Sequence, residues 1–397
     1  MREMTSSNSV DNMTWDTVCA NKFCASVTDG THDSPKPQKF GKKLITSKHL
    51  MGDYIDFDSA NWISENDYKK IISRSIVEQW DVLFSMIGTI GNIYIEKNPV
   101  VKYACKNMGI FKFAGNKENA YWMYYYLQSP QAKEYFQSHL RGSTQSYVPL
   151  CSLREMPVTI PDKKTRNGIV SLLRSLDVKI AINRAINDNL ADLLQTIYQE
   201  RFVNDILAVN QGVLSDICSY SRDKVAVSEL NVRTYFSTEN MLSGKAGSTE
   251  ATSLPTTSQT TACHKGDTLI SNIRPYFKKI VYCEDKCGCS TDVLCFTPSQ
   301  PRYSAYLFST LYADKFFAFM VAGSKGTKMP RGDKQQIMTY PVVLPSEEEL
   351  AGFNTIASPL LEQIYSNRAE NKRLSILRDT LLPKLMSGEI DVSTVQL

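Results

Sequence analysis

The chain contains a tandem duplication, and this repeat constrains its fold more than any other feature of the sequence. When the sequence is shifted by 184 positions, 13 of the 40 residues at 157–196 are identical to their counterparts at 341–380. Average amino-acid usage would give about two or three identities by chance. Because the shift is nearly half of the 397 residues, we expect two similar halves in tandem.

The repeated segments have the apolar spacing of amphipathic helices. A heptad that begins at Ile169 predicts a buried stripe whose d positions include Leu172, Ile186 and Leu193. The second copy has the same pattern from Phe353. We expect the two helices to pack against each other, and the simplest arrangement is antiparallel.

The ends of these helices are marked in the sequence. Asp162 can cap the first helix, and Ser346 with Glu349 has the pattern of a capping box at the start of the second. Gly388 is suited to end the second helix.

A proline interrupts the second helical segment. Because proline lacks the N–H that an internal turn needs, Pro359 predicts a break. We expect a short helix that ends near Ala357 and a long one from about Ser358 to Leu385, which would be about 40 Å long.

Two asparagines occupy equivalent a positions, Asn183 in the first helix and Asn367 in the second. Buried amides at such positions cost stability and fix the register and orientation of paired helices. The alternative is that both side chains point to solvent. Matching polar residues in both halves favour the register role.

The region before each helical segment mixes short β-rich runs with turn residues and one aromatic-rich helix, expected at 119–140 and at 304–321. The predicted fold class is α+β, with two tandem α/β domains joined by two long antiparallel helices that form a coiled coil. The predicted divisions are a first globular domain at 1–161, first spacer helices at 162–204, a second globular domain at 205–345 and second spacer helices at 346–397.

The overall charge of +4 names no partner, but basic residues gather on the loops of both halves. Glycine and basic side chains together suit close approach to phosphates, although a solvated charged face is the alternative for either cluster. The basic candidates for contact with nucleic acid are Lys36, Lys39, Lys42 and Lys43 in the first half, and Lys325, Lys328, Arg331 and Lys334 in the second.

Polar side chains on predicted exposed turns are the candidates for reading bases, since Arg pairs with guanine and Asn or Gln with adenine. Ordinary turn chemistry is the alternative for each of them. They are Thr31, His32, Ser143, Thr144, Gln145 and Tyr147 in the first half, and Asn272, Arg274 and Tyr276 in the second.

The sequence contains none of the common catalytic motifs. Glycine-rich phosphate loops and His-Glu-x-x-His are absent, and the four histidines are scattered. The spacing of Cys283, Cys287, Cys289 and Cys295 is unlike paired zinc knuckles and favours small buried thiols in a strand pair, with a zinc site as the alternative. We therefore expect no catalytic residue and no metal.

The start of the chain has no hydrophobic signal region, and its longest apolar run is too short to span a bilayer. Ten cysteines without a secretion signal fit reduced thiols in a cytoplasm. We expect a cytoplasmic protein without a membrane partner.

Several short motifs, in their order along the chain, resemble the specificity subunits of type I restriction–modification systems. The resemblance rests on four stretches: Asp29-Gly30-Thr31-His32, residues 52–57, residues 237–241, and Leu381 to Ile390 with its Leu-Leu-Pro-Lys-Leu core. The duplicated helices resemble the spacer regions of that family, and the variable regions resemble its two target-recognition domains.

The resemblance implies a non-catalytic reader of double-stranded DNA in a phage-defence system. Each domain would read one half of a bipartite target, and the coiled coil would set the gap between the halves. The implied partners are two modification subunits, which carry S-adenosylmethionine and methylate adenine, and optionally motor-nuclease restriction subunits; this chain itself would bind no cofactor. The alternatives are a coiled-coil scaffold that does not bind DNA, and a stand-alone DNA-modifying enzyme.

Overall fold

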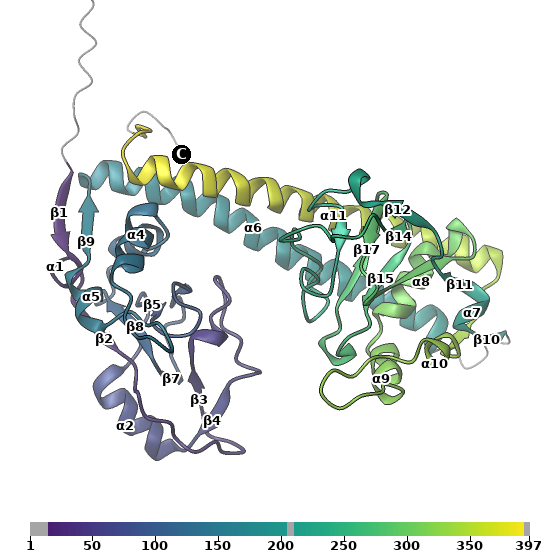
Figure 1. Cartoon of the computed structure of the whole chain (residues 1–397), viewed down its shortest axis with the longest axis horizontal. Coiled ribbons are helices and arrows are strands. Elements are labelled where there is room, and N and C mark those ends of the chain that lie inside the picture. The colour runs from purple at the N-terminus through teal and green to yellow at the C-terminus, as the bar shows by residue number, and fades with distance from the viewer. Residues whose placement is uncertain (1–14, 205–209, 393–397) are drawn as a thin grey trace, which may run out of the picture. The chain divides into compact units, whose positions relative to one another are not determined.

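The computed structural model describes residues 15–204 and 210–392. The chain forms two compact units, unit 1 with Met1–Lys179 and Arg373–Leu397, and unit 2 with Ile180–Lys372. Each unit takes one end of two long helices, α6 (Lys163–Tyr198) and α11 (Glu347–Met386), which are the teal and yellow helices of Figure 1. The predicted α+β fold class with two long helices is confirmed.

The globular part of unit 1 holds nine strands and five α-helices among the described residues. In chain order these are β1 (Asp16–Cys19), α1 (Ala20–Phe23), β2 (Ser26–Asp29), β3 (Lys42–Ile45), β4 (Asn61–Ile63), α2 (Glu65–Ser75), β5 (Val82–Ser85), β6 (Ile93–Ile95), β7 (Tyr103–Cys105), β8 (Met108–Lys112), α3 (Lys117–Tyr126), α4 (Pro130–Ser138), α5 (Leu150–Glu155) and β9 (Pro157–Ile160), with a 3-10 turn, η1 (Ser47–His49), after β3.

Unit 2 follows a similar plan over its described residues. After a π-helical turn, η2 (Gln199–Val203), come β10 (Gln211–Val213), α7 (Leu214–Ile217), β11 (Cys218–Tyr220), β12 (Lys224–Ala226), η3 (Val227–Glu229), β13 (Tyr235–Phe236), β14 (Gln259–Cys263), β15 (Thr268–Ser271), η4 (Pro275–Phe277), β16 (Ile280–Tyr282), β17 (Cys287–Cys289), β18 (Val293–Pro298), η5 (Pro301–Tyr303), α8 (Ser304–Tyr312), α9 (Asp314–Ala322), α10 (Lys334–Met338) and β19 (Pro341–Val343).

The sheets repeat the duplication seen in the sequence. Unit 1 has a four-stranded sheet of order β2-β8-β5-β6, and unit 2 has the corresponding order β11-β18-β15-β16. The antiparallel pair β1-β9 recurs as β10-β19, and the parallel pair β3-β7 recurs as β13-β17. The two halves therefore share a fold as well as a helical signature.

The predicted caps are present at both long helices. Asp162 accepts hydrogen bonds from the backbone N–H groups of Lys164 (2.9 Å) and Thr165 (3.1 Å). Ser346 and Glu349 form the reciprocal capping box, with bonds of 2.7 and 3.2 Å. Gly388 follows α11 with a φ of +78°, a conformation that glycine adopts without strain.

The predicted break at Pro359 is wrong, because α11 runs without interruption through it. Phe353 and Ala357 are fully buried before the proline, and Leu361 and Ile364 are buried after it. An internal proline costs a helix about 3 kcal/mol. Burial of the three large side chains Phe353, Leu361 and Ile364 offsets that cost, since each contributes about 1.5–3 kcal/mol.

Each predicted aromatic-rich helix is instead two helices. The first divides into α3 and α4, because Ser129 caps α4 through the N–H of Ala132 and Pro130 occupies its first turn. The second divides into α8 and α9 at Ala313, whose backbone is extended. The two breaks, at Ser129 and Ala313, are 184 positions apart and so belong to the repeat.

The heptad does not describe the buried stripe of α6 correctly. The d positions Ile186 and Leu193 are 39% and 48% exposed. The buried residues follow 11-residue steps instead, from Ile169 to Ile180 and from Asn183 to Leu194. Eleven residues in three turns give 3.67 per turn, which is nearer to a straight α-helix than the 3.5 of a heptad.

The two long helices run antiparallel where they meet inside each unit. In unit 1, the guanidinium of Arg378 on α11 lies 2.8 Å from the carboxylate of Asp177 on α6. In unit 2, Asn183 is 1% exposed and Asn367 is 6% exposed, and each bonds to the opposite helix. The solvent-facing alternative for these amides is thereby excluded, while their role in setting the register stays a prediction.

Candidate nucleic-acid interface

In unit 2, two segments far apart in sequence pair to form one surface. The loop after β15 and the hairpin between α9 and α10 meet in an isolated bridge of Ile273 with Arg331. The N–H of Arg274 donates to the carbonyl of Pro330 (2.8 Å), and that of Gly332 donates to Asn272 (3.2 Å). Five of the predicted residues are thereby brought beside each other, four of them exposed (Tyr276, Lys325, Lys328 and Arg331) and one half-buried (Arg274).

The local backbone of this surface depends on special residues. Arg274 and Lys278 have left-handed φ angles of 50° and 51° at the two ends of η4, which leaves Tyr276 half exposed between them. A Cβ at Gly332 would lie 2.8 Å from Met320 and 2.9 Å from the side-chain oxygen of Asn272. A side chain at this position would press on the ends of these two buried side chains, which would have to shift to make room.

Two cations of the surface are held by carboxylates. Arg331 lies 2.9 Å from Asp292, and Lys325 lies 2.5 Å from Asp333. The bond from Lys325 holds the pKa of Asp333 below its usual range, helped by two backbone N–H groups of α10. These exposed ion pairs contribute little stability in water. They orient the two cations, and a phosphate could displace the carboxylates at little cost in free energy.

Two of the predicted DNA-contacting residues in unit 2, Asn272 and Lys334, do not present exposed side chains on the hairpin and loop. Asn272 is buried (7% exposed), because its backbone pairs with both Gly332 and Asp292, so its prediction as an exposed reader is wrong. Its side-chain oxygen has no hydrogen-bond partner among the described residues. Lys334 opens α10 beyond the hairpin, with its ammonium 6.0 Å from the ring centre of Tyr220.

Unit 1 builds the same arrangement from the repeat-related segments. The loop after β5 and the hairpin between α4 and α5 meet in a bridge of Ile87 with Tyr147, and Tyr147 bridges back to Arg141. Gly142 turns the hairpin with a φ of +95°. The predicted residues Ser143, Thr144 and Gln145 lie exposed at its tip, and Tyr147 is half-buried at its base.

The other unit 1 candidates lie around β2 and β3. Lys36 and Lys39 are exposed on the connecting segment. Lys43 stacks over the ring of Trp62 (4.1 Å) and donates to a backbone carbonyl, while Lys42 lies 4.0 Å from Glu65. These internal contacts hold Lys42 and Lys43 against β4 and α2.

Thr31 and His32 have different environments. Thr31 is buried (6% exposed), and its hydroxyl accepts a hydrogen bond from the N–H of Asp33, so its prediction as an exposed reader is wrong. His32 is exposed and lies between Asp29 (2.8 Å) and Asn107 (2.9 Å). Turn chemistry explains Thr31, whereas His32 keeps an accessible ring edge.

Sequence reasoning missed two residues of these surfaces. Arg141 is the repeat counterpart of Lys325, and applying the 184-residue shift to the basic hairpin would have found it. Asp292 holds Arg331 from the turn between β17 and β18, and nothing in the sequence there indicated that contact.

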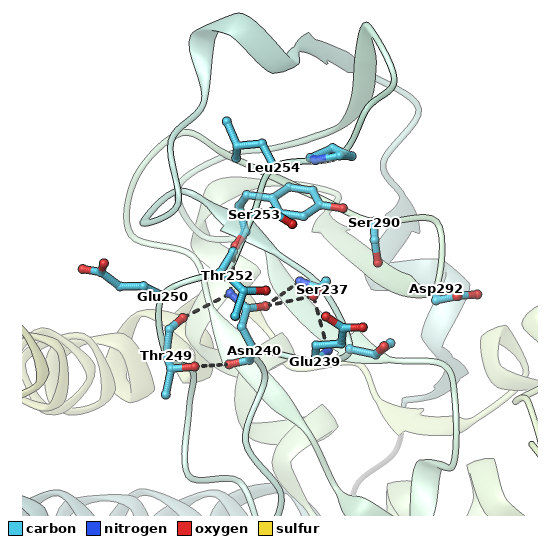
Figure 2. Close-up of a pocket in the computed structure, with 14 residues that line it drawn as sticks. Ser237, Glu239, Asn240, Thr249, Glu250, Thr252, Ser253, Leu254, Ser290 and Asp292 are labelled. Carbon is cyan, nitrogen blue, oxygen red and sulfur yellow. Dashed lines mark hydrogen bonds between the residues drawn. The ribbon is translucent and has the colours of Figure 1, made fainter. Parts of the chain in front are cut away.

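A polar cleft of about 330 Å³ lies elsewhere in unit 2, around the motif at 237–241 (Figure 2). The side chain of Asn240 links the segments that line the cleft. It accepts a hydrogen bond from the N–H of Ser237 (2.7 Å) and donates hydrogen bonds to the carbonyls of Tyr235 and Thr249. The lining contains the carboxylates of Glu239, Glu250 and Asp292 and no Lys or Arg, which is unsuited to a phosphate. The motif at 237–241 is therefore explained by its structural role in the walls of the cleft and not by contact with a phosphate.

Within the described part of the chain, no group of three or more His, Cys, Asp or Glu is arranged to hold a metal ion. The Cys283, Cys287, Cys289 and Cys295 thiols are buried together at the strands β17 and β18, as the sequence favoured. No helix among the described residues is both long and apolar enough to cross a membrane.

Comparisons with known proteins agree with this geometry. Residues 37–191 match the family described as "Type I restriction modification DNA specificity domain". The HindI specificity subunit of Haemophilus influenzae is 26% identical over 163 residues, 39% of this chain and 35% of that protein. The MjaIX specificity subunit of Methanocaldococcus jannaschii is 34% identical over 73 residues, 18% and 17% of the two chains.

A solved structure extends the likeness in fold to almost the whole chain. The S subunit of a type I restriction–modification system from M. genitalium superposes with a TM-score of 0.53 at 16% identity, over 94% of this chain and 96% of that one. The sequence matches, by contrast, span only 35% and 17% of the curated relatives.

Residues 37–191 thus resemble the DNA specificity domain of type I restriction–modification systems. The chain's resemblance to type I restriction–modification specificity subunits is confirmed.

Proposed function

We propose that the chain reads a bipartite target in double-stranded DNA, one half with the hairpin and loop of each unit. The observation that supports this is the recurrence of one loop–hairpin pairing in both units, at Ile87 with Tyr147 and at Ile273 with Arg331. A scaffold without a ligand has no use for two exposed, polar and repeat-related surfaces. The residues at the two tips differ, so the two half-targets differ in sequence.

We further propose that α6 and α11 set the unread gap between the half-targets. A helix of 36 residues is about 54 Å long, which exceeds one turn of DNA at about 34–36 Å. The buried amides of Asn183 and Asn367 support a fixed helix pairing.

The partners follow from the family resemblance and the internal symmetry. Two repeat-related halves present two similar docking surfaces, which suits two copies of a modification subunit. Those subunits would supply S-adenosylmethionine and methylate adenine, with restriction subunits as optional partners, and this chain would bind no cofactor of its own. A cytoplasmic location is part of the same proposal, because the DNA and the partners are there.

The test maps methylated adenines across the genome with and without this gene. We expect one split sequence to lose its methylation when the gene is removed. Inserting one helical turn into both α6 and α11 should lengthen the gap and leave both half-sequences unchanged. Methylation of DNA by the isolated chain would favour the stand-alone enzyme. An affinity for DNA that depends neither on salt concentration nor on sequence would favour the scaffold.

A further inference from the structure

Five of the ten cysteines lie in one buried cluster of unit 2. They come from three neighbouring strands and one turn, and pack with Met241, Leu269 and Val281. The five are Cys263 on β14, Cys283 in the turn after β16, Cys287 and Cys289 on β17, and Cys295 on β18.

Cys283 and Cys287 are a matched pair within this cluster. They flank the turn at 284–286, and their sulfur atoms lie 3.6 Å apart. The backbone fixes both ends of the turn, because Cys283 donates to the carbonyl of Asp267 (2.8 Å) and Cys287 pairs with Cys263 across the sheet. A disulfide needs its sulfurs about 2.05 Å apart, so the two sulfur atoms would have to approach by about 1.5 Å to form the bond.

The two thiols differ in acidity. Hydrogen bonds from the Cys263 and Cys283 thiols lower the pKa of Cys287, and His264 nearby acts in the same direction. A hydrogen bond with the Cys263 thiol lowers the pKa of Cys283, but the bond with Cys287, burial and the charges of nearby thiols outweigh it, so this pKa lies above its usual value. Cys287 is therefore the more acidic thiol of the pair, and the thiolate form of a cysteine is its nucleophilic form.

We propose that Cys287 and Cys283 form a reversible disulfide when the protein meets hydrogen peroxide. The Cys287 thiolate attacks one peroxide oxygen, which breaks the O–O bond, leaves a sulfenic acid on Cys287 and releases hydroxide. The Cys283 thiol then attacks that sulfur, the S–S bond forms, and the sulfenic oxygen leaves as water. In total, two thiols and one peroxide give one disulfide and two water molecules, and a reducing thiol reverses the step.

The cysteine pair is connected through the backbone to the exposed surface formed by the loop after β15 and the hairpin between α9 and α10. Cys287 opens β17, which leads through Ser290 to Asp292. Asp292 holds the guanidinium of Arg331 and, through its carbonyl, the backbone of Asn272. The chemical proposal does not depend on what that surface binds.

The test treats the folded full-length chain with hydrogen peroxide and maps its peptides without reduction. Trypsin cleaves after Lys286 and so places Cys283 and Cys287 on separate peptides, 280–286 and 287–302. We expect these two peptides to become linked, with fragmentation assigning the bond to Cys287, and the link to disappear in dithiothreitol. Cys283→Ser should stop at a sulfenic acid on Cys287, which dimedone traps.

A matched control is Cys218→Ser, a buried cysteine outside the cluster, which should form the link as the natural chain does. Absence of the link, a bond through Cys263, Cys289 or Cys295, or a sulfenic acid that forms on Cys283 would each overturn the proposal. If Cys283→Ser fails to fold, the peptide map of the natural chain decides alone.

Discussion

Asn183 donates a hydrogen bond of 2.9 Å to the side chain of Asn371, and Asn367 donates one of 2.9 Å to Asn187. The 184-residue shift converts one pair into the other, since Asn183 corresponds to Asn367 and Asn187 to Asn371. The two halves of the duplication therefore meet through equivalent, exchanged contacts within unit 2. This is the local symmetry expected of a duplicated chain whose halves pair as a homodimer would.

Replacing Asn183 by leucine should destabilise the protein. The substitution takes the donor away from the half-buried side-chain oxygen of Asn371 and from a carboxylate oxygen of Glu370, at a cost of about 1–3 kcal/mol in the free energy of unfolding. Urea titration measures the change. Adding Asn371→Leu should recover most of the loss, because two apolar partners then face each other, whereas Asn189→Leu on the exposed face of α6 should change stability by less than about 0.5 kcal/mol. Additive losses in the double variant would contradict the pairing.

The helices and strands were largely predictable, because they depend on local spacing. The strand runs at 268–271 and 293–296 and the caps at Asp162 and Ser346 follow from neighbouring residues alone. The continuous path through Pro359 was not predictable, since it depends on burial by residues distant in sequence.

The candidate site was predictable only in part. The repeat and the basic loops indicated the two hairpins, but whether a polar residue on a turn is buried depends on what packs over it. Thr31 and Asn272 are covered by backbone from residues 75 and 60 positions away, at Lys106 and Gly332. Nothing in the sequence near either residue reports that contact.

Gly332→Ala should weaken binding to one half-target only. Its Cβ would lie within 3 Å of the ends of three buried side chains, one of them Asn272 beside Arg274, and the overpacking displaces either these side chains or the hairpin. We expect at least a tenfold loss of affinity for DNA, with the sequence preference of the other half unchanged, measured by fluorescence anisotropy on targets with one half scrambled. Gly352→Ala is the control, because that glycine lies in α11, where a Cβ would make only an ordinary van der Waals contact of 3.5 Å with Arg201 and alanine favours the helix. Equal loss on both half-targets would contradict a separate role for each unit.

Lys328→Ala should weaken DNA binding without changing which sequence is preferred. Lys328 is exposed at the tip of the unit 2 hairpin, where an ammonium would contact a phosphate and release about one counterion. The slope of log affinity against log salt should therefore fall by about one. Lys69→Ala, which removes an exposed lysine from α2, should leave the slope unchanged. A changed sequence preference with the same salt slope would indicate base contact instead.

Glu284→Gln should make the protein more stable at alkaline pH and leave it unchanged at acidic pH. Burial raises the pKa of Glu284 from 4.5 to about 7, so the folded state holds this proton more tightly than the unfolded chain does. Stability from this group is present below pH 4.5 and is lost as the pH rises through 7, where the carboxylate must be charged inside the fold. Because the group is only partly buried, solvent screening reduces the effect to the order of 1 kcal/mol. Urea titrations at pH 4 and pH 8 measure the difference between the variant and the natural chain, and Glu348→Gln on the surface controls for loss of a carboxylate. A difference of the same size at both pH values would show that the amide acts through packing and not through charge.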